Sequence, residues 1–188
     1  PHVSPEAALA ELRRALDPGA RGKGCRMDSL HGAARSGKPR LAAEFQTRIG
    51  AQARSLTARC LPYGDGITFL PLMELVHSLG GDEAIVTTVG AEPDGALIVE
   101  RICGAIGPTS DPASTEETFW AIRRLLETLA RDRPLVVCFE DVHWAEPTFL
   151  DLLEYVAGWS KGAPILLLCV ARPELLEGRP RWGGEALI

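Results

Sequence analysis

The sequence has no long apolar run, no closely paired cysteines and no excess of basic residues. No apolar run approaches the roughly 20 residues that a membrane-spanning helix needs, so we expect no membrane insertion. The five cysteines are scattered without a CxxC pair, which argues against a zinc or redox site. The formal net charge of −5 argues against direct binding of nucleic acid. These absences favour a globular domain in the reducing cytoplasm.

A secretory leader is also absent from the given sequence. Acidic residues such as Glu6, Glu11 and Asp17 interrupt the first twenty residues, which excludes a signal-peptide core. The chain starts at Pro1 and stops at Ile188 without a terminating signal, and we expect it to be a piece of a longer protein. Its 46% hydrophobic and 24% charged residues are typical of an ordinary folded domain.

Residues 32–39, GAARSGKP, have the spacing of a phosphate-binding loop, Gly-x-x-x-x-Gly-Lys. In such a loop, backbone N–H groups wrap a phosphate, the lysine reaches the terminal phosphates, and a helix N-terminus contributes its dipole. The next residue is normally Ser or Thr, whose hydroxyl binds Mg²⁺. Here that residue is Pro39. The motif alone is a weak signal, and its context decides its meaning.

Apolar periodicity predicts strands that alternate with helices. Two runs, residues 135–139 and 165–170, are apolar throughout, as in strands of a parallel sheet that is covered on both faces. We therefore predict an α/β fold with a mostly parallel sheet. The remaining predicted strands are 27–31 and 55–60, and the predicted helices are 5–16, 41–49, 71–79, 82–107 with a break at 92–95, 115–129 and 147–157. Ser4 and Ser114 are the predicted helix caps.

The strand at 27–31 is the weakest of these predictions. Asp28 and Ser29 stand where a buried parallel strand favours Val or Ile. We count this weakness, with Pro39, against an intact nucleotide site.

Polar side chains follow three of the predicted strands. His31 and Gly32 end the first, Glu140 and Asp141 follow the run at 135–139, and Arg172 follows the run at 165–170. Ligands of parallel sheets bind at the carboxyl ends of the strands, so these residues could share one crevice. A nucleotide triphosphate brings Mg²⁺, which needs an acid nearby, and a second acid can activate the attacking water.

Five blocks of the chain together resemble the AAA-type ATPase domain of large bacterial signalling proteins. They are GAARSGKPRLAAEF, RCLPYGDGITFLPL, ETFWAIRRLLETLA, LVVCFEDVHWAEPTFLDLLEYVA and ILLLCVARPELL. The resemblance is to the STAND-class P-loop NTPases, found in LuxR-type and SARP-type transcriptional regulators and some adenylate-cyclase-associated proteins. It implies a three-layer P-loop NTPase fold with a helical insertion between the second strand and the Walker B strand. The EDVHWAEP block is its most specific part.

The resemblance also implies roles for particular residues. The Walker A loop, which would bind ATP or ADP, consists of Gly32, Ala33, Ala34, Arg35, Ser36, Gly37, Lys38 and Pro39. Glu140 becomes the Walker B acid that holds Mg²⁺, often through water, and Asp141 the candidate catalytic base. Arg172 would sense the γ-phosphate. His143 and Trp144 are a family signature that we interpret mainly as packing and positioning, and His31 as the end of a strand rather than a ligand.

Two loop residues depart from the family pattern. A small residue is usual where Arg35 stands, and Arg35 could add positive charge to the site or obstruct it. Pro39 lacks the metal-binding hydroxyl and the backbone N–H. It also disfavours a helical conformation at Lys38, although proline is tolerated in a first helical turn. We therefore expect Mg²⁺-dependent hydrolysis to be impaired and nucleotide binding to persist in weakened form.

The sequence thus predicts an ATP-binding switch module of a larger cytoplasmic signalling or transcription-regulating protein. We divide it into an N-terminal helix and basic linker at 1–26 and the NTPase domain at 27–188, which we expect to stop before its last strand. The expected partners are a nucleotide and other domains of the same polypeptide, with self-association left open. Whether the domain is an active ATPase stays open, and the role of the insertion at 61–113 is not predicted. The alternative is a nucleotide-free scaffold or protein-interaction domain.

Overall fold

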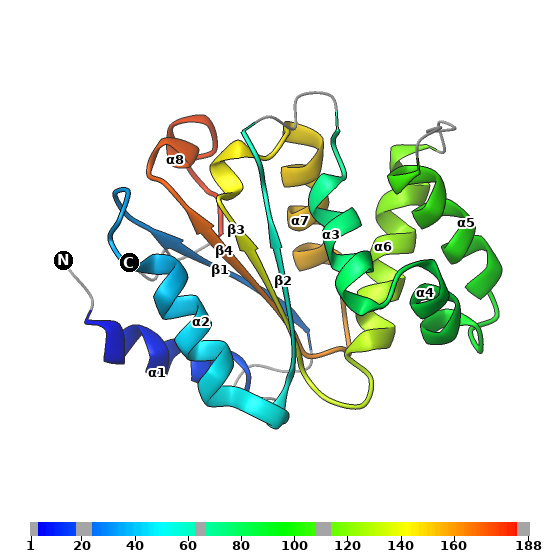
Figure 1. Ribbon diagram of the computed structural model, residues 1–188, viewed down its shortest axis with the longest axis horizontal. Coiled ribbons are helices and arrows are strands. Elements are labelled where there is room, and N and C mark those ends of the chain that lie inside the picture. Colours follow the sequence, from blue (N-terminus) through cyan, green and yellow to red (C-terminus); the bar gives the residue numbers. More distant parts are fainter. Residues whose placement is uncertain (1–3, 18–23, 63–66, 108–113, 184–188) are drawn as a thin grey trace.

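Four parallel strands form a sheet with helices on both faces, as the ribbon of the computed structural model shows (Figure 1). The structure describes residues 4–17, 24–62, 67–107 and 114–183. The strands are β1 (Cys25–His31), β2 (Arg54–Arg59), β3 (Leu135–Glu140) and β4 (Ile165–Ala171), in the order β1-β4-β3-β2. All three pairings are parallel. The predicted α/β class and parallel sheet are confirmed.

The two central strands are buried on both faces, which explains their unbroken apolar sequences. Side chains of β3 and β4 alternate between two hydrophobic clusters. Those of Val136, Cys138, Leu166, Leu168 and Val170 face helices α1 and α2, whereas Leu135, Val137, Phe139, Ile165 and Leu167 face helices α3–α7. The thiols of Cys138 and Cys169 are buried within these strands, because both residues are at most 1% exposed.

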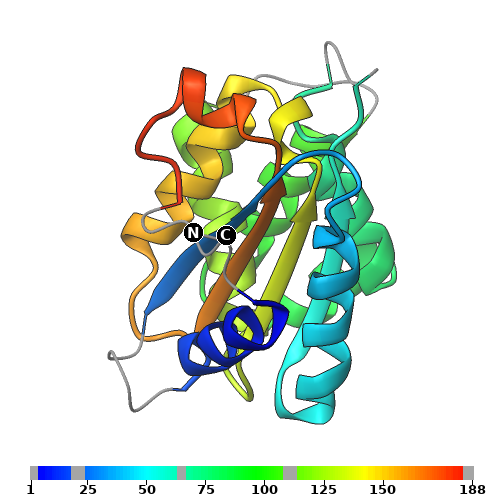
Figure 2. The ribbon, with the colours of Figure 1, turned by 90° about the vertical axis from the view of Figure 1, so that its left-hand side faces the viewer.

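Helices α1 (Pro5–Ala15) and α2 (Lys38–Ile49) cover one face of the sheet (Figure 2). The Ser4 side chain accepts a hydrogen bond from the Ala7 N–H and caps α1, as predicted. Leu9 and Leu12 of α1 are buried in the same cluster as Phe45 of α2. The first helix therefore packs into the core of the sheet rather than standing apart from it.

The other face is covered by α3 (Leu70–Leu79), α4 (Asp82–Val89), α5 (Gly95–Ile106), α6 (Thr115–Leu129) and α7 (Pro147–Trp159). The helices α3, α4 and α5 lie between β2 and β3 in the chain, so the predicted helical insertion is present. The predicted break falls between α4 and α5. The Ser114 hydroxyl accepts from the Glu117 N–H, as the predicted cap requires. Short helices η1 (Gly50–Gln52), η2 (Val142–Trp144) and α8 (Glu174–Gly178) complete the described elements.

The expectation that residues 27–31 form a poor strand was wrong. A complete strand runs from Cys25 to His31 and pairs along its whole length with β4. Asp28 is only 3% exposed, but its carboxylate accepts a hydrogen bond of 2.7 Å from the Arg26 side chain. A buried charge is tolerated when it is paired in this way. The strand therefore supplies no argument against the nucleotide site.

Some sequence predictions lie outside the described residues. They include part of the basic linker that precedes residue 27, at 18–23, and part of the block RCLPYGDGITFLPL, at 63–66. The division of the chain at residue 26 stays a prediction. Among the described helices, none is both long and apolar enough to cross a membrane.

The insertion helices pack into the larger hydrophobic cluster of the sheet, which gives a first prediction. Ile102 of α5 is fully buried, whereas Leu97 on the same helix is 40% exposed. Ile102→Ala should lower the free energy of unfolding by about 2 to 5 kcal/mol, because the substitution leaves a cavity. Leu97→Ala, the matched control, should change it by about 0.5 kcal/mol or less. Urea unfolding followed by circular dichroism measures both, and equal midpoints for the two variants would contradict this packing.

Candidate functional site

The candidate site lies at the carboxyl ends of the strands. The loop at 32–37 leaves β1, the Glu140–Asp141 pair ends β3, and Arg172 follows β4. Because the three strands are parallel and adjacent, these ends meet at one edge of the sheet (Figure 2). The predicted convergence of the loop, the acids and Arg172 on one edge therefore follows from the strand order.

Lys38 begins helix α2 and turns its side chain back into the loop. Its ammonium donates to the carbonyl oxygens of Gly32 and Ala33 and to the Ser36 hydroxyl, the last two at 2.8 and 2.9 Å. These three bonds use all the donors of an ammonium group. Lys38 is only 8% exposed although most of the loop around it is exposed. The loop thus surrounds its lysine with oxygen atoms.

Gly32 makes this arrangement possible. A Cβ at position 32 would lie 2.9 Å from the Ser36 hydroxyl and 3.4 Å from the Lys38 ammonium nitrogen. Such a Cβ would displace the Ser36 hydroxyl, whereas its distance to the Lys38 nitrogen is an ordinary contact. The first glycine of the motif therefore leaves space for the Ser36 hydroxyl that accepts from Lys38.

Two further loop residues have a left-handed backbone. Gly37 has φ of 83°, and Arg35 has φ of 65°. Only glycine adopts this region without cost, whereas a residue with a Cβ is strained there by about 1 to 2 kcal/mol. Arg35 therefore strains this turn, whereas Gly37 does not.

Pro39 lies in the first turn of α2 and does not prevent Lys38 from starting the helix. Proline is tolerated there because the first amides of a helix have no partner within it. The expected disturbance of the helical conformation at Lys38 is therefore not seen. The chemical consequence is unchanged, because position 39 offers neither a hydroxyl group nor a backbone N–H.

The two acids end β3 and differ in conformation. Glu140 is the last residue of the strand, and Asp141 follows with φ of 55°, a left-handed turn that Asp tolerates better than most residues. Both carboxylates lie beside Arg59, the last residue of β2. The Arg59 guanidinium donates to Glu140 Oε2 at 2.6 Å and lies 3.8 Å from Asp141 Oδ2.

Arg172 lies over the ring of Trp144, with 5.9 Å between the guanidinium carbon and the ring centroid. The centroid of the Trp144 ring lies 5.0 Å from that of the His143 ring, and the two rings are tilted by 43°. A cavity of about 680 Å³ opens next to these rings, between η2, α7 and α8. His143 is half-buried and Trp144 is 46% exposed, so the predicted packing role of this pair stays a prediction.

Charge and burial act together on the basic groups of this edge. Burial lowers the pKa of Lys38, and the nearby Arg172 lowers it further, while Asp141 and Glu174 oppose the shift. Burial also lowers the pKa of His143, again with a contribution from Arg172. His31 is 5% exposed, and burial lowers its pKa too. The two histidines therefore favour the neutral form, and Lys38, Arg172 and Asp141 act on one another electrostatically.

The residues present do not fit a resident Mg²⁺ ion. The loop has no hydroxyl at position 39, and the Glu140 carboxylate already accepts two hydrogen bonds from Arg59. Nor do the described residues contain any cluster of three or more His, Cys, Asp or Glu side chains that could hold a metal. Mg²⁺ prefers several oxygen ligands in an octahedral arrangement. We therefore derive no step that uses the ion.

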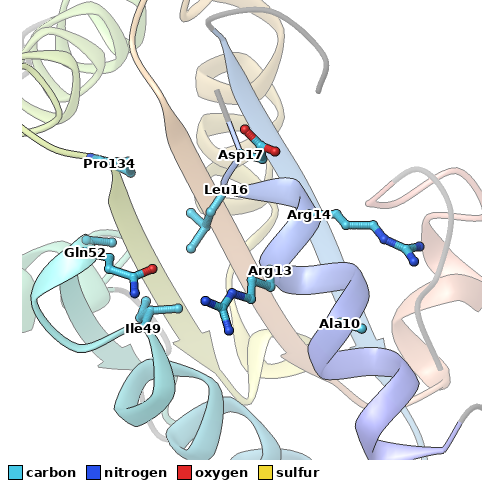
Figure 3. A pocket seen from close by; sticks show the side chains of 9 residues that line it. Ala10, Arg13, Arg14, Leu16, Asp17, Ile49, Gln52 and Pro134 are labelled. Atoms are coloured by element: carbon cyan, nitrogen blue, oxygen red, sulfur yellow. The ribbon is translucent and has the colours of Figure 1, made fainter. Parts of the chain in front are cut away.

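A second cavity lies at the opposite edge of the sheet (Figure 3). It has a volume of about 470 Å³ and is lined by the ends of α1 and α2 and by Pro134, which precedes β3. Arg13, Arg14 and Leu16 are among its residues. Because it lies at the amino end of β3, it is remote from the loop and the acids.

Sequence reasoning missed Arg59 as a member of the site. The strand register pairs Arg59 with Glu140, and its backbone N–H donates to Glu74 of α3 at 2.7 Å. The signal available was a basic residue at the end of the second predicted strand, within the block RCLPYGDGITFLPL. Before the pairing of β2 with β3 is known, nothing in the sequence connects Arg59 with Glu140.

The left-handed turn at Arg35 gives the second prediction. Arg35→Gly should raise the free energy of unfolding by about 0.5 to 1 kcal/mol, because relief of backbone strain exceeds the entropy that glycine adds to the unfolded chain. Ala34→Gly is the matched control. Ala34 has no positive φ, so this change should lower stability by about 0.4 to 1 kcal/mol. Thermal unfolding of both variants tests this, and a destabilised Arg35→Gly protein would contradict the turn.

Comparisons with known proteins bear on the family and the fold of the chain. The chain is 32% identical to an uncharacterized protein of Rhizobium meliloti over 77% of its own length, and it spans 16% of that protein. The described fold resembles the Aeropyrum pernix ORC2 protein, solved in complexes with ADPNP and ADP. The TM-score is 0.51 and the identity 15%, over 95% of this chain and 44% of that one. The family model described as "AAA ATPase domain" matches residues 5–168, and the chain therefore belongs to the AAA ATPase domain family.

Proposed function

We propose that the chain is an ATP- and ADP-binding switch module of a larger cytoplasmic signalling or transcription-regulating protein, of the STAND class. The observation that carries the proposal is the enclosure of Lys38 by the 32–37 loop, at the same sheet edge as Asp141 and Arg172. Cations and exposed backbone amides at a helix N-terminus suit a polyphosphate. The complexes of the ORC2 protein with ADPNP and ADP support nucleotide as the ligand class.

The loop residues have distinct roles in this proposal. The backbone of Gly32, Ala33, Ala34, Arg35, Ser36 and Gly37 surrounds the phosphates, and Pro39 follows without an amide to contribute. Lys38 exchanges its bonds to the loop oxygens for bonds to the terminal phosphates. Arg172 reaches the γ-phosphate, whose presence or absence distinguishes ATP from ADP. Charge-assisted bonds of this kind are stronger than bonds between neutral groups.

Hydrolysis is weak or absent in this proposal. Asp141 is the candidate base for an attacking water, with Glu140 beside it. Each is close to Arg59, which lies 3.8 Å from the Asp141 carboxylate and is hydrogen-bonded to Glu140. The Arg59 guanidinium thus occupies the space beside both acids. In this proposal the site binds nucleotide and hydrolyses it slowly or not at all, as a switch requires.

The proposed setting is the cytoplasm, with other domains of the same polypeptide as partners. The low share of the Rhizobium meliloti protein that the chain spans supports a module of a larger protein. The described cysteines are all free thiols, which suits a reducing compartment. Self-association stays an open alternative. The acidic net charge supports no direct role in nucleic-acid binding.

A nucleotide-free scaffold is the second candidate function. The observation that favours it is the same set of three hydrogen bonds, because a lysine that is satisfied by its own loop needs no phosphate. The two functions differ in whether these bonds exchange when ATP is added.

The third prediction separates the two functions. Isothermal titration of the chain with ATP and with ADP should show binding at millimolar nucleotide or below. Lys38→Ala should weaken ATP binding about tenfold or more, because a hydrogen bond to a charged group contributes about 1.5 to 3 kcal/mol. Lys161→Ala is the matched control, since Lys161 is exposed and remote from the loop. No heat of binding with either nucleotide would select the scaffold.

The fourth prediction concerns hydrolysis. Phosphate release from ATP by the unmodified chain should be no faster than release by Asp141→Asn, because Pro39 leaves the loop without a metal-binding hydroxyl and Arg59 already holds the Glu140 carboxylate. A continuous phosphate assay measures both rates under conditions in which ATP is bound. If the unmodified chain is clearly faster than Asp141→Asn, the domain is a working ATPase and the proposed impairment fails.

A further inference from the structure

Arg59 is fixed by contacts at both its backbone and its side chain. Its N–H donates to Glu74 at 2.7 Å, and the next amide, of Cys60, donates to the Glu140 carbonyl at 2.9 Å. Its guanidinium donates twice to the same Glu140 oxygen, through Nη2 at 2.6 Å and Nε at 3.1 Å. The side chain is therefore held over the acids by β2, β3 and α3 together.

The position of this guanidinium matters because of what it faces. Glu140 and Asp141 bring two negative charges to the edge where the phosphates of a nucleotide would lie. In P-loop enzymes a divalent cation between the acid and the phosphates removes that repulsion. Here the Glu140 side chain is only 17% exposed and one oxygen is taken by Arg59, whose own side chain is 55% exposed. The part of the Arg59 side chain that does not contact the acids is thus open to a further anion.

The loop lacks the usual metal-binding hydroxyl at the same edge of the sheet. Pro39 provides no hydroxyl where the motif normally has Ser or Thr. A metal ion that retained only the acid as a ligand would be weakly held. The loop has no hydroxyl ligand at position 39, and the Glu140 carboxylate is already bound to Arg59. These two independent features both weaken the binding of a divalent cation.

We propose that Arg59 takes the place of the divalent cation, so that the chain binds the phosphates of a nucleotide without Mg²⁺. Arg59 neutralises Glu140 and Asp141 and presents its remaining N–H groups toward the phosphates. Guanidinium is suited to this role, because its planar fork of donors matches both carboxylate and phosphate oxygens and its charge is permanent. The inference rests on the proposed nucleotide binding, and its test includes one measurement without nucleotide.

The first measurement is titration of the 188-residue chain with Mn²⁺, followed by electron paramagnetic resonance, in the absence of nucleotide. The double variant Pro39→Ser with Arg59→Gln regains a hydroxyl and frees both acids. It should bind Mn²⁺ about tenfold more tightly than the unmodified chain, a difference of about 1.4 kcal/mol. Arg48→Gln is the matched control: Arg48 is also 55% exposed and paired with a glutamate, Glu44, but it lies near the far end of α2.

The second measurement is ATP affinity with Mg²⁺ and with excess EDTA. The unmodified chain and Arg48→Gln should bind ATP at least as tightly in EDTA as in Mg²⁺. Pro39→Ser alone should behave in the same way, because Arg59 still occupies Glu140. The double variant should bind about tenfold more tightly with Mg²⁺ than without it. Thermal unfolding of each variant confirms that it is folded.

The outcomes distinguish this inference from the proposed function. Mn²⁺ binding by the unmodified chain that equals binding by the double variant would overturn the role of Arg59. So would an ATP affinity of the unmodified chain that rises about tenfold with Mg²⁺. If no protein binds ATP but the double variant alone gains Mn²⁺ binding, the role of Arg59 as the resident cation stands and the nucleotide switch fails.

Discussion

Strands β3 and β4 are apolar on both faces, and this double burial determines where every polar group of the site can lie. A charged side chain within either strand would lie in one of the two hydrophobic clusters. Burial of such a charge is costly unless it is paired. The acids and Arg172 therefore follow the strands instead of interrupting them. The polar residues of the site lie at one edge of the sheet because the hydrophobic core excludes unpaired charged side chains from the strands themselves.

The sequence alone was sufficient for the parts of the fold that depend on local patterns. Apolar runs predicted β3 and β4, Ser4 and Ser114 predicted two helix starts, and the Gly-x-x-x-x-Gly-Lys spacing predicted the turn between β1 and α2. Strand β1 was predicted less well, because the pairing of Asp28 with Arg26 cannot be inferred from a preference for apolar residues. Strand propensity describes single residues, whereas the cost of burying a charge depends on whether it has a partner.

Only those parts of the candidate site that belong to sequence motifs could be predicted. The loop, the acids and Arg172 each follow a recognisable strand, so their common edge could be expected from a parallel sheet. Arg59 could not be expected, because its contact with Glu140 exists only when β2 pairs with β3 in the observed register. The same limit applies to Arg35. Its identity departs from the pattern that the resemblance implies, but only the backbone angle shows that it stands in a left-handed turn.

These observations separate what preserves the fold from what performs chemistry. Pro39 is compatible with the first turn of α2, and Arg35 strains one turn of an exposed loop, so neither affects the two hydrophobic clusters. The core constrains β3 and β4 far more strongly than it constrains the residues that follow them. An AAA ATPase domain can therefore lack a hydroxyl at this loop position and carry an arginine beside its acids while its sheet stays intact. A cation fixed to β2 moves with the protein, whereas Mg²⁺ arrives and leaves with the nucleotide. In this domain the charge that balances the acids is consequently independent of the ligand that the loop would bind.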